Sequence, residues 1–368
     1  MGSIRRIAIN AGGGYVPGLD LVVSAVARAA ARQGWDAVVI RDGFDGLLEP
    51  GRFGGAGVVP AAHQPPGTGA RIDPFKARSL DADGFVSEVD RSDELLAALD
   101  AAGIDAVISI VGGSAVTGIH AASVALKLSR KGLRCVAIPK SVENDITGIA
   151  LPLGADSALN EAVRLLSGIT TGAREAGRVA VAELPGSQSG WLALQAGLAL
   201  QADAVVIPEL PGDPATLAAA LPASATLVVV ATGARFPAHA ASSADPMRAS
   251  LSPLSDPAQP GGLVTAGRAA ITLATAIQRH SGREALAFTP DQMIRGGSAS
   301  ALDRELAAAY GVAAVEALAS GTAGSMLSFA PPKMEALPLA ATLGGPRVVP
   351  LDGALIRAAR GLGIVMEG

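Results

Sequence analysis

Short apolar runs alternate with helix-length periodic segments along most of the chain, and this alternation limits the possible folds more than any other feature. The sequence predicts strands over residues 4–10, 36–40, 106–111, 135–138, 178–183, 204–207, 226–231 and 284–288. It predicts helices over residues 19–33, 88–102, 116–131, 155–167, 190–201, 214–221, 262–280 and 301–319, and a last strand at 347–350 with a helix from Asp352. Such alternation indicates an α/β fold with a mainly parallel sheet and helices on both faces.

Length and composition exclude several classes of protein. The 368 residues suffice for one large α/β domain or for two smaller lobes. No apolar run reaches the roughly 18 residues of a membrane span, and the run after Arg5 and Arg6 is too short for a signal peptide. Cys135 is the only cysteine, which excludes an intrachain disulfide and argues against a cysteine-bound metal.

The charge balance also limits the partners. The net charge is −4, there is no basic block, and the aromatic residues are only seven Phe, two Trp and two Tyr. A nucleic-acid surface needs clustered basic and aromatic side chains, so none is expected. We therefore expect a soluble, cytoplasmic protein that binds neither membrane nor nucleic acid.

A dense polar cluster follows the strand predicted for residues 135–138, which we expect to end at Pro139. Its members are Lys140, Ser141, Glu143, Asn144 and Asp145, in a chain otherwise rich in Ala, Val, Leu and Gly. Ligands of open α/β sheets bind at the carboxyl ends of strands. Residues 136–154 are therefore a candidate functional site, with an ordinary solvated loop as the alternative.

Glycine-rich turns follow two other predicted strands. Gly12, Gly13 and Gly14 precede the helix predicted at 19–33, and Gly112 and Gly113 follow the strand at 106–111. Without side chains, such turns let backbone N–H groups approach an anion, and the helix dipole helps to hold it. Phosphate binding is one interpretation of these turns, and a simple tight turn is the other.

Several spaced segments, taken in order, resemble the phosphofructokinase family, including its pyrophosphate-dependent branch. They are Gly12-Gly13-Gly14-Tyr15-Val16-Pro17-Gly18, Thr68-Gly69-Ala70-Arg71 with Pro74-Phe75-Lys76, Gly112-Gly113, Pro139-Lys140-Ser141-Val142-Glu143-Asn144-Asp145, Gly186 with Gly190-Trp191-Leu192-Ala193-Leu194, and Arg295-Gly296-Gly297-Ser298 with Asp303-Arg304. The match spans residues 4 to about 330. Any one segment is weak, but the ordered set is specific.

The resemblance implies two Rossmann-like lobes with mainly parallel sheets. Residues 1–150 would form an N-terminal donor-phosphate lobe, and residues 151–320 a sugar or acceptor lobe, with the chain free to cross back between them. Residues 321–368 would supply a strand and a helix that pack back on the N-terminal lobe. A homodimer or homotetramer is also implied, because Arg178 matches an arginine that reaches the sugar phosphate of a neighbouring subunit.

The implied activity is phosphoryl transfer from ATP or pyrophosphate, with Mg²⁺, to a hydroxyl of a phosphorylated small molecule. Such transfer depends on positioning and charge neutralisation, and a carboxylate takes the proton of the attacking hydroxyl. Glu143 occupies the place of the family's catalytic Asp and is one methylene, about 1.5 Å, longer. Asp145 matches the metal-holding Asp, Ser141 keeps the hydroxyl of a family Thr, and Lys140 matches the lysine of pyrophosphate users.

The resemblance also assigns the contacts to the two substrates. The donor phosphates would meet Gly13, Gly14, Arg71, Gly112, Gly113, Ser114 and Ala115. The acceptor would meet Arg178, Gly186, Ser187, Gln292 and Arg295. For Arg178 and Arg295, an ordinary surface ion pair is the alternative.

Several positions depart from the family. Ser114 replaces a metal-linked Asp, and Ala115 is neither the Gly of ATP users nor the usual Asp of pyrophosphate users. Ser187 replaces an arginine that stabilises the transition state, a type of residue that can be worth several orders of magnitude in rate. Gly233 and Leu286 fall near places where a sugar-binding Glu and a sugar-phosphate Arg are expected. These changes predict an acceptor other than the fructose 6-phosphate of ordinary glycolysis.

Three functions stay open at this point. The first is a divergent phosphotransferase that uses Glu143 as its base. The second is a repurposed member that performs elimination, isomerisation or condensation on a phosphorylated substrate, because Ser114 and Ser187 lack the charges that phosphoryl transfer needs. The third is a non-catalytic subunit that binds a phosphorylated metabolite.

Overall fold

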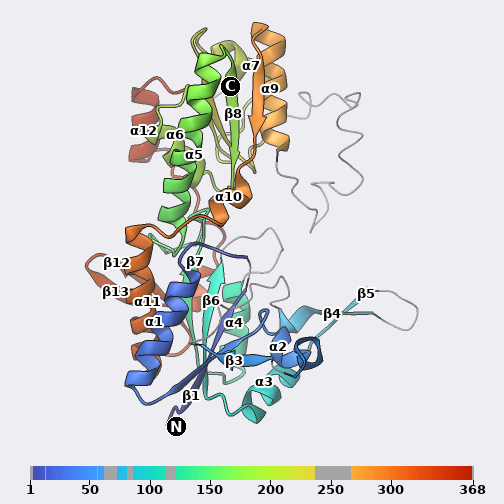
Figure 1. The fold of residues 1–368 in the computed structure, drawn as a ribbon, viewed down its shortest axis with the longest axis vertical. Coiled ribbons are helices and arrows are strands. Elements are labelled where there is room, and N and C mark those ends of the chain that lie inside the picture. Colours follow the sequence, from blue (N-terminus) through green and yellow to red (C-terminus); the bar gives the residue numbers. More distant parts are fainter. Residues whose placement is uncertain are drawn as a thin grey trace.

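The chain forms two lobes stacked along the longest axis of the molecule, each built on its own sheet (Figure 1). The structure is a computed structural model that describes residues 3–12, 14–55, 57–61, 73–80, 86–112, 121–236 and 267–366. Within these ranges, no helix has the length and apolar character needed to cross a membrane. The predicted α/β class with mainly parallel sheets is confirmed.

The first lobe contains a seven-stranded sheet in the order β13-β12-β7-β6-β1-β2-β3. Its strands are β1 (Arg6–Ala11), β2 (Asp36–Ile40), β3 (Val58–Pro60), β6 (Ala106–Gly112), β7 (Cys135–Lys140), β12 (Ser325–Ala330) and β13 (Lys333–Pro338). The pairs from β12 to β2 are parallel, whereas β3 and β13 add antiparallel edges. The central strands are almost continuously apolar, as is typical of a parallel sheet covered on both faces.

Helices cover both faces of this sheet. On one face α1 (Leu19–Arg32) packs against α11 (Ala301–Ala319), and on the other lie α3 (Ser92–Ala101) and α4 (Ala121–Arg130). Alternate residues of β1 show the arrangement, because Ile7 and Ile9 face the α1 side while Ala8 faces α3 and α4. Shorter elements complete the lobe: α2 (Asp45–Leu48), η1 (Pro50–Phe53), η2 (Pro74–Lys76), the hairpin of β4 (Ala77–Leu80) and β5 (Val86–Val89), and η5 (Leu339–Thr342).

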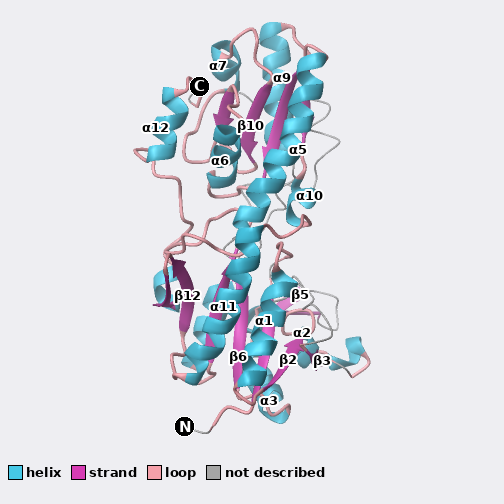
Figure 2. Ribbon diagram, turned by 60° about the vertical axis from the view of Figure 1, so that its left-hand side comes forward, coloured by secondary structure: helices cyan, strands magenta, loops and turns pink. Residues whose placement is uncertain are grey.

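The second lobe contains a four-stranded parallel sheet in the order β11-β8-β10-β9. Its strands are β8 (Val179–Leu184), β9 (Ala204–Val206), β10 (Leu227–Ala231) and β11 (Ala285–Phe288). One face carries α5 (Ala155–Glu175) and α6 (Trp191–Ala199), and the other carries α7 (Pro214–Ala220) and α9 (Arg268–Ser281). The short helix α10 (Asp291–Arg295) packs on α5, which also contacts α11 of the first lobe (Figure 2).

The C-terminal part differs from its prediction. The strands after α11 are β12 and β13, which were not predicted, whereas residues 347–350 form no strand. The last helix, α12 (Ala354–Gly361), packs on α6 in the second lobe, so the prediction that it packs on the N-terminal lobe is wrong. The reason is that α12 buries Ile356 and Ala359, and Val365 then pairs with Ala204 at the start of β9.

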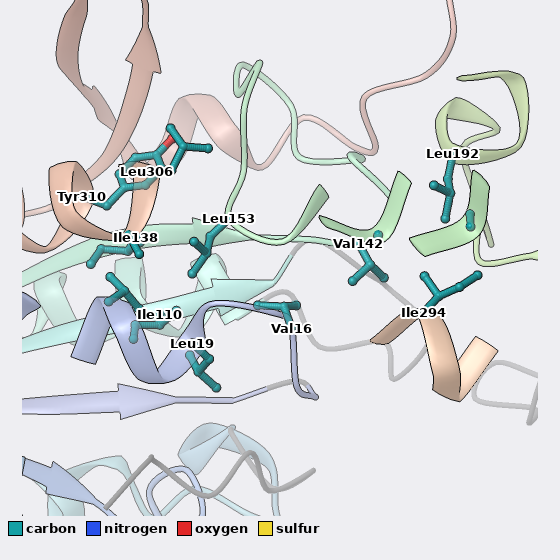
Figure 3. Packing of buried hydrophobic residues seen from close by; sticks show 14 of the residues in the cluster. Val16, Leu19, Ile110, Ile138, Val142, Leu153, Leu192, Ile294, Leu306 and Tyr310 are labelled. Atoms are coloured by element: carbon teal, nitrogen blue, oxygen red, sulfur yellow. The ribbon is translucent and has the colours of Figure 1, made fainter. Parts of the chain in front are cut away.

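One apolar cluster continues from the first lobe into the second. Figure 3 shows Ile138 and Leu153 near the first sheet and Ile294 and Leu192 beyond Val142, and all five side chains belong to this cluster. The two lobes are therefore packed together on this side, and the polar groups described next lie at the same junction.

Candidate functional site

The end of β7 brings the polar cluster to the junction of the lobes. The prediction that this strand ends at Pro139 is wrong, because β7 continues to Lys140, which pairs with Gly112 of β6. The ladder between β7 and β12 stops at Ala137, and Leu153 takes the free edge, donating to the Pro139 carbonyl at 3.0 Å. Proline is tolerated because its nitrogen faces this irregular edge rather than β6.

Glu143 is a first-lobe carboxylate held by groups of the second lobe. It is 2% exposed, and its Oε2 accepts hydrogen bonds from the backbone N–H and the hydroxyl of Ser187, both at 3.0 Å. Its Oε1 lies 3.5 Å from Nη2 of Arg295. Burial, followed by the charge of Asp145, raises the pKa of Glu143, and the contacts from Ser187 and Arg295 oppose this shift only in part. The structure thus forms a buried carboxyl that holds its proton more tightly than an ordinary glutamate.

Asp145 is tied to Glu143 by the hydroxyl of Ser141. That hydroxyl donates to Oδ1 of Asp145 at 2.6 Å and accepts from the backbone N–H of Glu143 at 3.1 Å. Asn144, between the two acidic residues, has a φ of 55°, in the left-handed region that Asn enters more readily than most residues. The two carboxylates are therefore held in one tight turn.

Lys140 links this turn to the first glycine-rich segment. Its side chain is 1% exposed, and its ammonium donates to the backbone carbonyl of Gly14. Burial and, to a smaller extent, the positive charge of Arg295 lower the pKa of Lys140 to about 7. A buried cation beside a glycine-rich turn is suited to hold a phosphate.

The predicted acceptor residues lie in different places. Ser187 contacts Glu143, and the carbonyl of the preceding Gly186 accepts from Gly233 at 2.9 Å. On α10, Arg295 approaches Glu143, whereas Gln292 is exposed and its amide donates to Asp291.

Arg178 does not join the cluster within one chain. It lies just before β8, at the end opposite Gly186, and forms an exposed ion pair with Glu284 at 2.7 Å. Its expected contact with a neighbouring subunit stays a prediction. The predicted donor residues Gly13, Arg71, Gly113, Ser114 and Ala115 lie outside the described residues.

A magnesium ion fits the residues present at this turn. In the described ranges, no three His, Cys, Asp or Glu side chains gather to form an all-protein metal site. Mg²⁺ in phosphoryl-transfer sites is usually bound by one or two carboxylates together with waters and the phosphates of the substrate. Asp145 would provide the carboxylate of such a shared site.

Two contacts of the site were not predicted from the sequence. Nothing in the pattern around Ser187 indicates that it binds Glu143, 44 positions earlier. Arg347, whose guanidinium donates to Asn144 from 203 positions away, lies in a stretch that was predicted as a plain strand. Paired substitutions at these positions among homologous chains are the signal that would reveal such contacts.

Comparisons with known proteins identify the family of the chain. The family described as Phosphofructokinase matches residues 6–318. A relative from Chloroflexus aggregans named ATP-dependent 6-phosphofructokinase is 32% identical over 376 aligned residues, covering 98% of this chain and 97% of the relative. A relative from Thermus thermophilus named ATP-dependent 6-phosphofructokinase 1 is 32% identical over 343 residues, covering 91% and 93%.

Solved structures show the same fold. The pyrophosphate-dependent phosphofructokinase of Nitrosospira multiformis matches with a TM-score of 0.72 at 19% identity, covering 100% of this chain and 93% of its own. The phosphofructokinase of Saccharomyces cerevisiae matches with a TM-score of 0.67 at 24% identity, covering 92% of this chain and 45% of its own. With the family match extending over most of the sequence, the predicted resemblance is confirmed, and the chain belongs to the phosphofructokinase family.

Proposed function

We propose that this protein transfers a phosphoryl group from ATP or pyrophosphate to a hydroxyl of a phosphorylated sugar or a related alcohol. The observation that carries the proposal is the buried carboxylate of Glu143, held beside Asp145, Lys140 and Arg295 where the two lobes meet. A base, a second carboxylate and two cations are the groups that phosphoryl transfer requires.

Glu143 acts as the base through its Oε1. Its Oε2 already accepts two hydrogen bonds from Ser187, whereas among the described residues Oε1 has only the 3.5 Å contact with Arg295. Oε1 is therefore the oxygen that takes the proton of the attacking hydroxyl. Arg295 remains close enough to bind the phosphate of the acceptor as it arrives.

The donor phosphates bind on the first-lobe side, in residues 1–150. Lys140 and the glycine-rich turn at Gly14 would hold them, and Asp145 would hold Mg²⁺ together with them. The charge that develops on the transferred group would be offset by Mg²⁺ at this position. The relatives named as ATP-dependent favour ATP as the donor, whereas the buried lysine is equally suited to pyrophosphate.

The acceptor differs from fructose 6-phosphate in this proposal. Ser187 offers a neutral hydroxyl where the family has an arginine, and it uses that hydroxyl on Glu143. Gly233, which has no side chain to offer a substrate, lies against the same loop. An acceptor with fewer negative charges near these positions fits them better.

A donor and acceptor panel tests the function. Purified protein is incubated with Mg²⁺ and either ATP or pyrophosphate, with fructose 6-phosphate, other sugar phosphates and unphosphorylated sugars as acceptors, and transfer is followed by ³¹P NMR. Transfer from one donor to an acceptor other than fructose 6-phosphate is expected. Fructose 6-phosphate as the best acceptor contradicts the altered specificity. Turnover of a phosphorylated compound without donor or Mg²⁺ indicates non-kinase chemistry instead, and binding without any turnover indicates a non-catalytic subunit.

The proposed homodimer or homotetramer is tested separately, by light scattering in the same buffer.

Replacing Lys140 by Met is expected to stabilise the fold and weaken donor binding. Below a pH of about 7 the folded protein carries a buried ammonium, whereas the unfolded chain keeps this proton up to the ordinary lysine pKa of 10.5. Below pH 7 the folded state therefore bears the full cost of burying the ammonium. As the pH rises from about 7 to 10.5, the free energy of unfolding of the wild type increases. Urea unfolding at pH 6 should show Lys140→Met more stable by about 1–2 kcal/mol, with a smaller difference at pH 9.

The matched control for this change is Lys333→Met, at an exposed position of β13. It should change neither the stability nor the KM for the donor. A Lys140→Met protein less stable than wild type at pH 6 would contradict the assignment of Lys140 as a strained, functional cation.

Replacing Ser187 by Ala is expected to raise the pKa of Glu143 further. The hydroxyl bond favours the charged carboxylate, so its loss favours the protonated form, while the backbone N–H bond remains. A hydrogen bond to a charged group is worth about 1.5–3 kcal/mol, so kcat/KM near neutral pH should fall about tenfold and the rising limb of the pH profile should shift upward. Ser167→Ala, at an exposed hydroxyl of α5, is the control, and an unchanged pH profile for Ser187→Ala would count against the contact.

A further inference from the structure

Residues 345–349, called the strap here, cross from the first lobe to the second and lie along the turn that carries the two carboxylates. The backbone N–H of Arg347 donates to the carbonyl of Asp145 at 2.8 Å, and Pro346 pairs with Ile146 in an antiparallel bridge. The hydroxyl of Thr147 donates to the carbonyl of Gly345 at 2.5 Å. The strap is therefore held against the turn that carries Glu143 and Asp145 by one isolated β-bridge and two further hydrogen bonds.

The side chain of Arg347 holds the centre of that turn. Its Nη1 donates to Oδ1 of Asn144 at 2.8 Å and lies 3.4 Å from the Asn144 carbonyl. Asn144 has the positive φ described above, a conformation that costs of order 1 kcal/mol and persists only where neighbours fix it. Because Asn144 lies between Glu143 and Asp145, its conformation sets the directions of both carboxylates.

The same residue also holds the loop that carries Ser187. The Arg347 guanidinium stacks on the ring of Trp191 at 4.3 Å, and the Arg347 carbonyl accepts from Nε1 of Trp191 at 3.0 Å and from the hydroxyl of Ser189 at 2.8 Å. Ser189 and Trp191 follow Ser187 by two and four positions. A neighbouring bond, from Val349 N–H to Glu209 at 2.8 Å, anchors the strap in the second lobe.

We propose that Arg347 is a positioning residue that sets how Glu143 meets Ser187 across the two lobes. It contacts neither side chain directly and acts through Asn144 on one side and Trp191 on the other. A displacement of about 1 Å in a catalytic group can change a rate about a hundredfold, so a residue that fixes both partners of the Glu143 contact controls the base. The inference rests on the proposed role of Glu143 as that base.

The backbone of the strap makes its contacts independently of the Arg347 side chain. The N–H bond to Asp145 and the carbonyl bonds from Trp191 and Ser189 remain when only the guanidinium is removed. Arg347→Met, which keeps the length and the apolar stem, should therefore fold with the strap in place. Arg347→Lys keeps the charge and one donor for Asn144 but loses the planar stack on Trp191.

The test follows the contact between Ser187 and Glu143 directly, without any need for turnover. The backbone amide signal of Ser187, which donates to Glu143, is identified in ¹⁵N-serine-labelled protein by its absence in Ser187→Ala. It is compared at one pH in ligand-free wild type, Arg347→Met, Arg347→Lys and the control Arg164→Met, an exposed arginine of α5. None of these variants replaces Asp145, Lys140 or Arg295. A longer hydrogen bond to Glu143 should shift the Ser187 amide proton upfield in Arg347→Met, with Arg347→Lys between it and wild type.

Kinetics then separate positioning from binding. In Arg347→Met, kcat should fall about 10- to 100-fold with little change in KM, and Arg347→Lys should recover part of the loss. A wild-type Ser187 amide signal in Arg347→Met overturns the proposal, even if Arg347→Met is also less active. If wild-type protein transfers no phosphoryl group at all, the proposed function fails, while the Ser187 signal still decides whether Arg347 positions Glu143.

Discussion

Glu143→Gln is expected to lower kcat by about 10²- to 10⁴-fold with little change in the KM for either substrate, because Gln keeps the shape and the Ser187 contacts but cannot accept a proton. Steady-state kinetics with the donor and acceptor identified by the panel measure this loss. The control is Glu175→Gln, at an exposed position near the end of α5, which should retain full activity. Full activity in Glu143→Gln would exclude Glu143 as the base.

The pH dependence of the rate and of the stability should also report the role of Glu143. The pKa of Glu143 is raised in the folded protein, so the base becomes active only as the pH rises through a value above the ordinary glutamate range. Between the ordinary glutamate pKa and the raised pKa of Glu143, the folded state binds more protons than the unfolded chain. The free energy of unfolding is therefore greatest below the ordinary pKa and falls as the pH rises through the raised pKa of the folded protein. Glu143→Gln should lack both the rising limb of the rate profile and this loss of stability.

Gly233→Ala is expected to destabilise the protein by about 3 kcal/mol and to lower kcat at the same time. A Cβ at this position would lie 2.0 Å from the carbonyl oxygen of Ser187 and 2.9 Å from that of Gly186. Both obstacles are backbone atoms, so relief requires the loop that carries Ser187 to move away from Glu143. Urea unfolding and kcat measured on the same preparation test the two effects together.

Gly168→Ala provides the matched control. Gly168 lies inside α5, and a Cβ added there would meet no atom within 4 Å. Alanine is favoured over glycine inside a helix by about 0.5–1 kcal/mol, so this variant should be slightly more stable and fully active. If Gly233→Ala is also neutral, the loop around Ser187 is not fixed in the way the structure indicates.

Much of the fold follows from local patterns in the sequence. The strand at β1 and the helix at α1 were predicted within a few residues, because an apolar run, a glycine-rich turn and an apolar face recur in order. The hairpin of β12 and β13 was missed because most side chains of β13 are at least partly exposed, which leaves no clear apolar signal. Pro139 was predicted to end the strand because proline cannot donate a hydrogen bond to a neighbouring strand. Beyond Ala137, however, β7 has no regular strand on the edge that the proline nitrogen faces, so the proline does not interrupt β7.

The candidate site was predicted only where it is local in sequence. The cluster from Lys140 to Asp145 was singled out from its polarity alone, and the structure buries these charged side chains at the lobe junction. The contacts of Ser187 and Arg347 depend on how two separate sheets are placed, and no local pattern encodes that placement. The roles of these residues in catalysis stay predictions until the variants are measured.

The sheet of the first lobe has a consequence for the order in which the protein can form. Its strands β12 and β13, and the helix α11 that covers α1, come from residues 301–338, after all four strands of the second lobe have been made. During synthesis from the N-terminus, β7 therefore emerges with one edge open and α1 with its apolar face uncovered, while the second lobe can complete its own sheet first. We infer that the sheet begun first is completed last, and that its unfinished edge is the part of the nascent chain most in need of protection from aggregation.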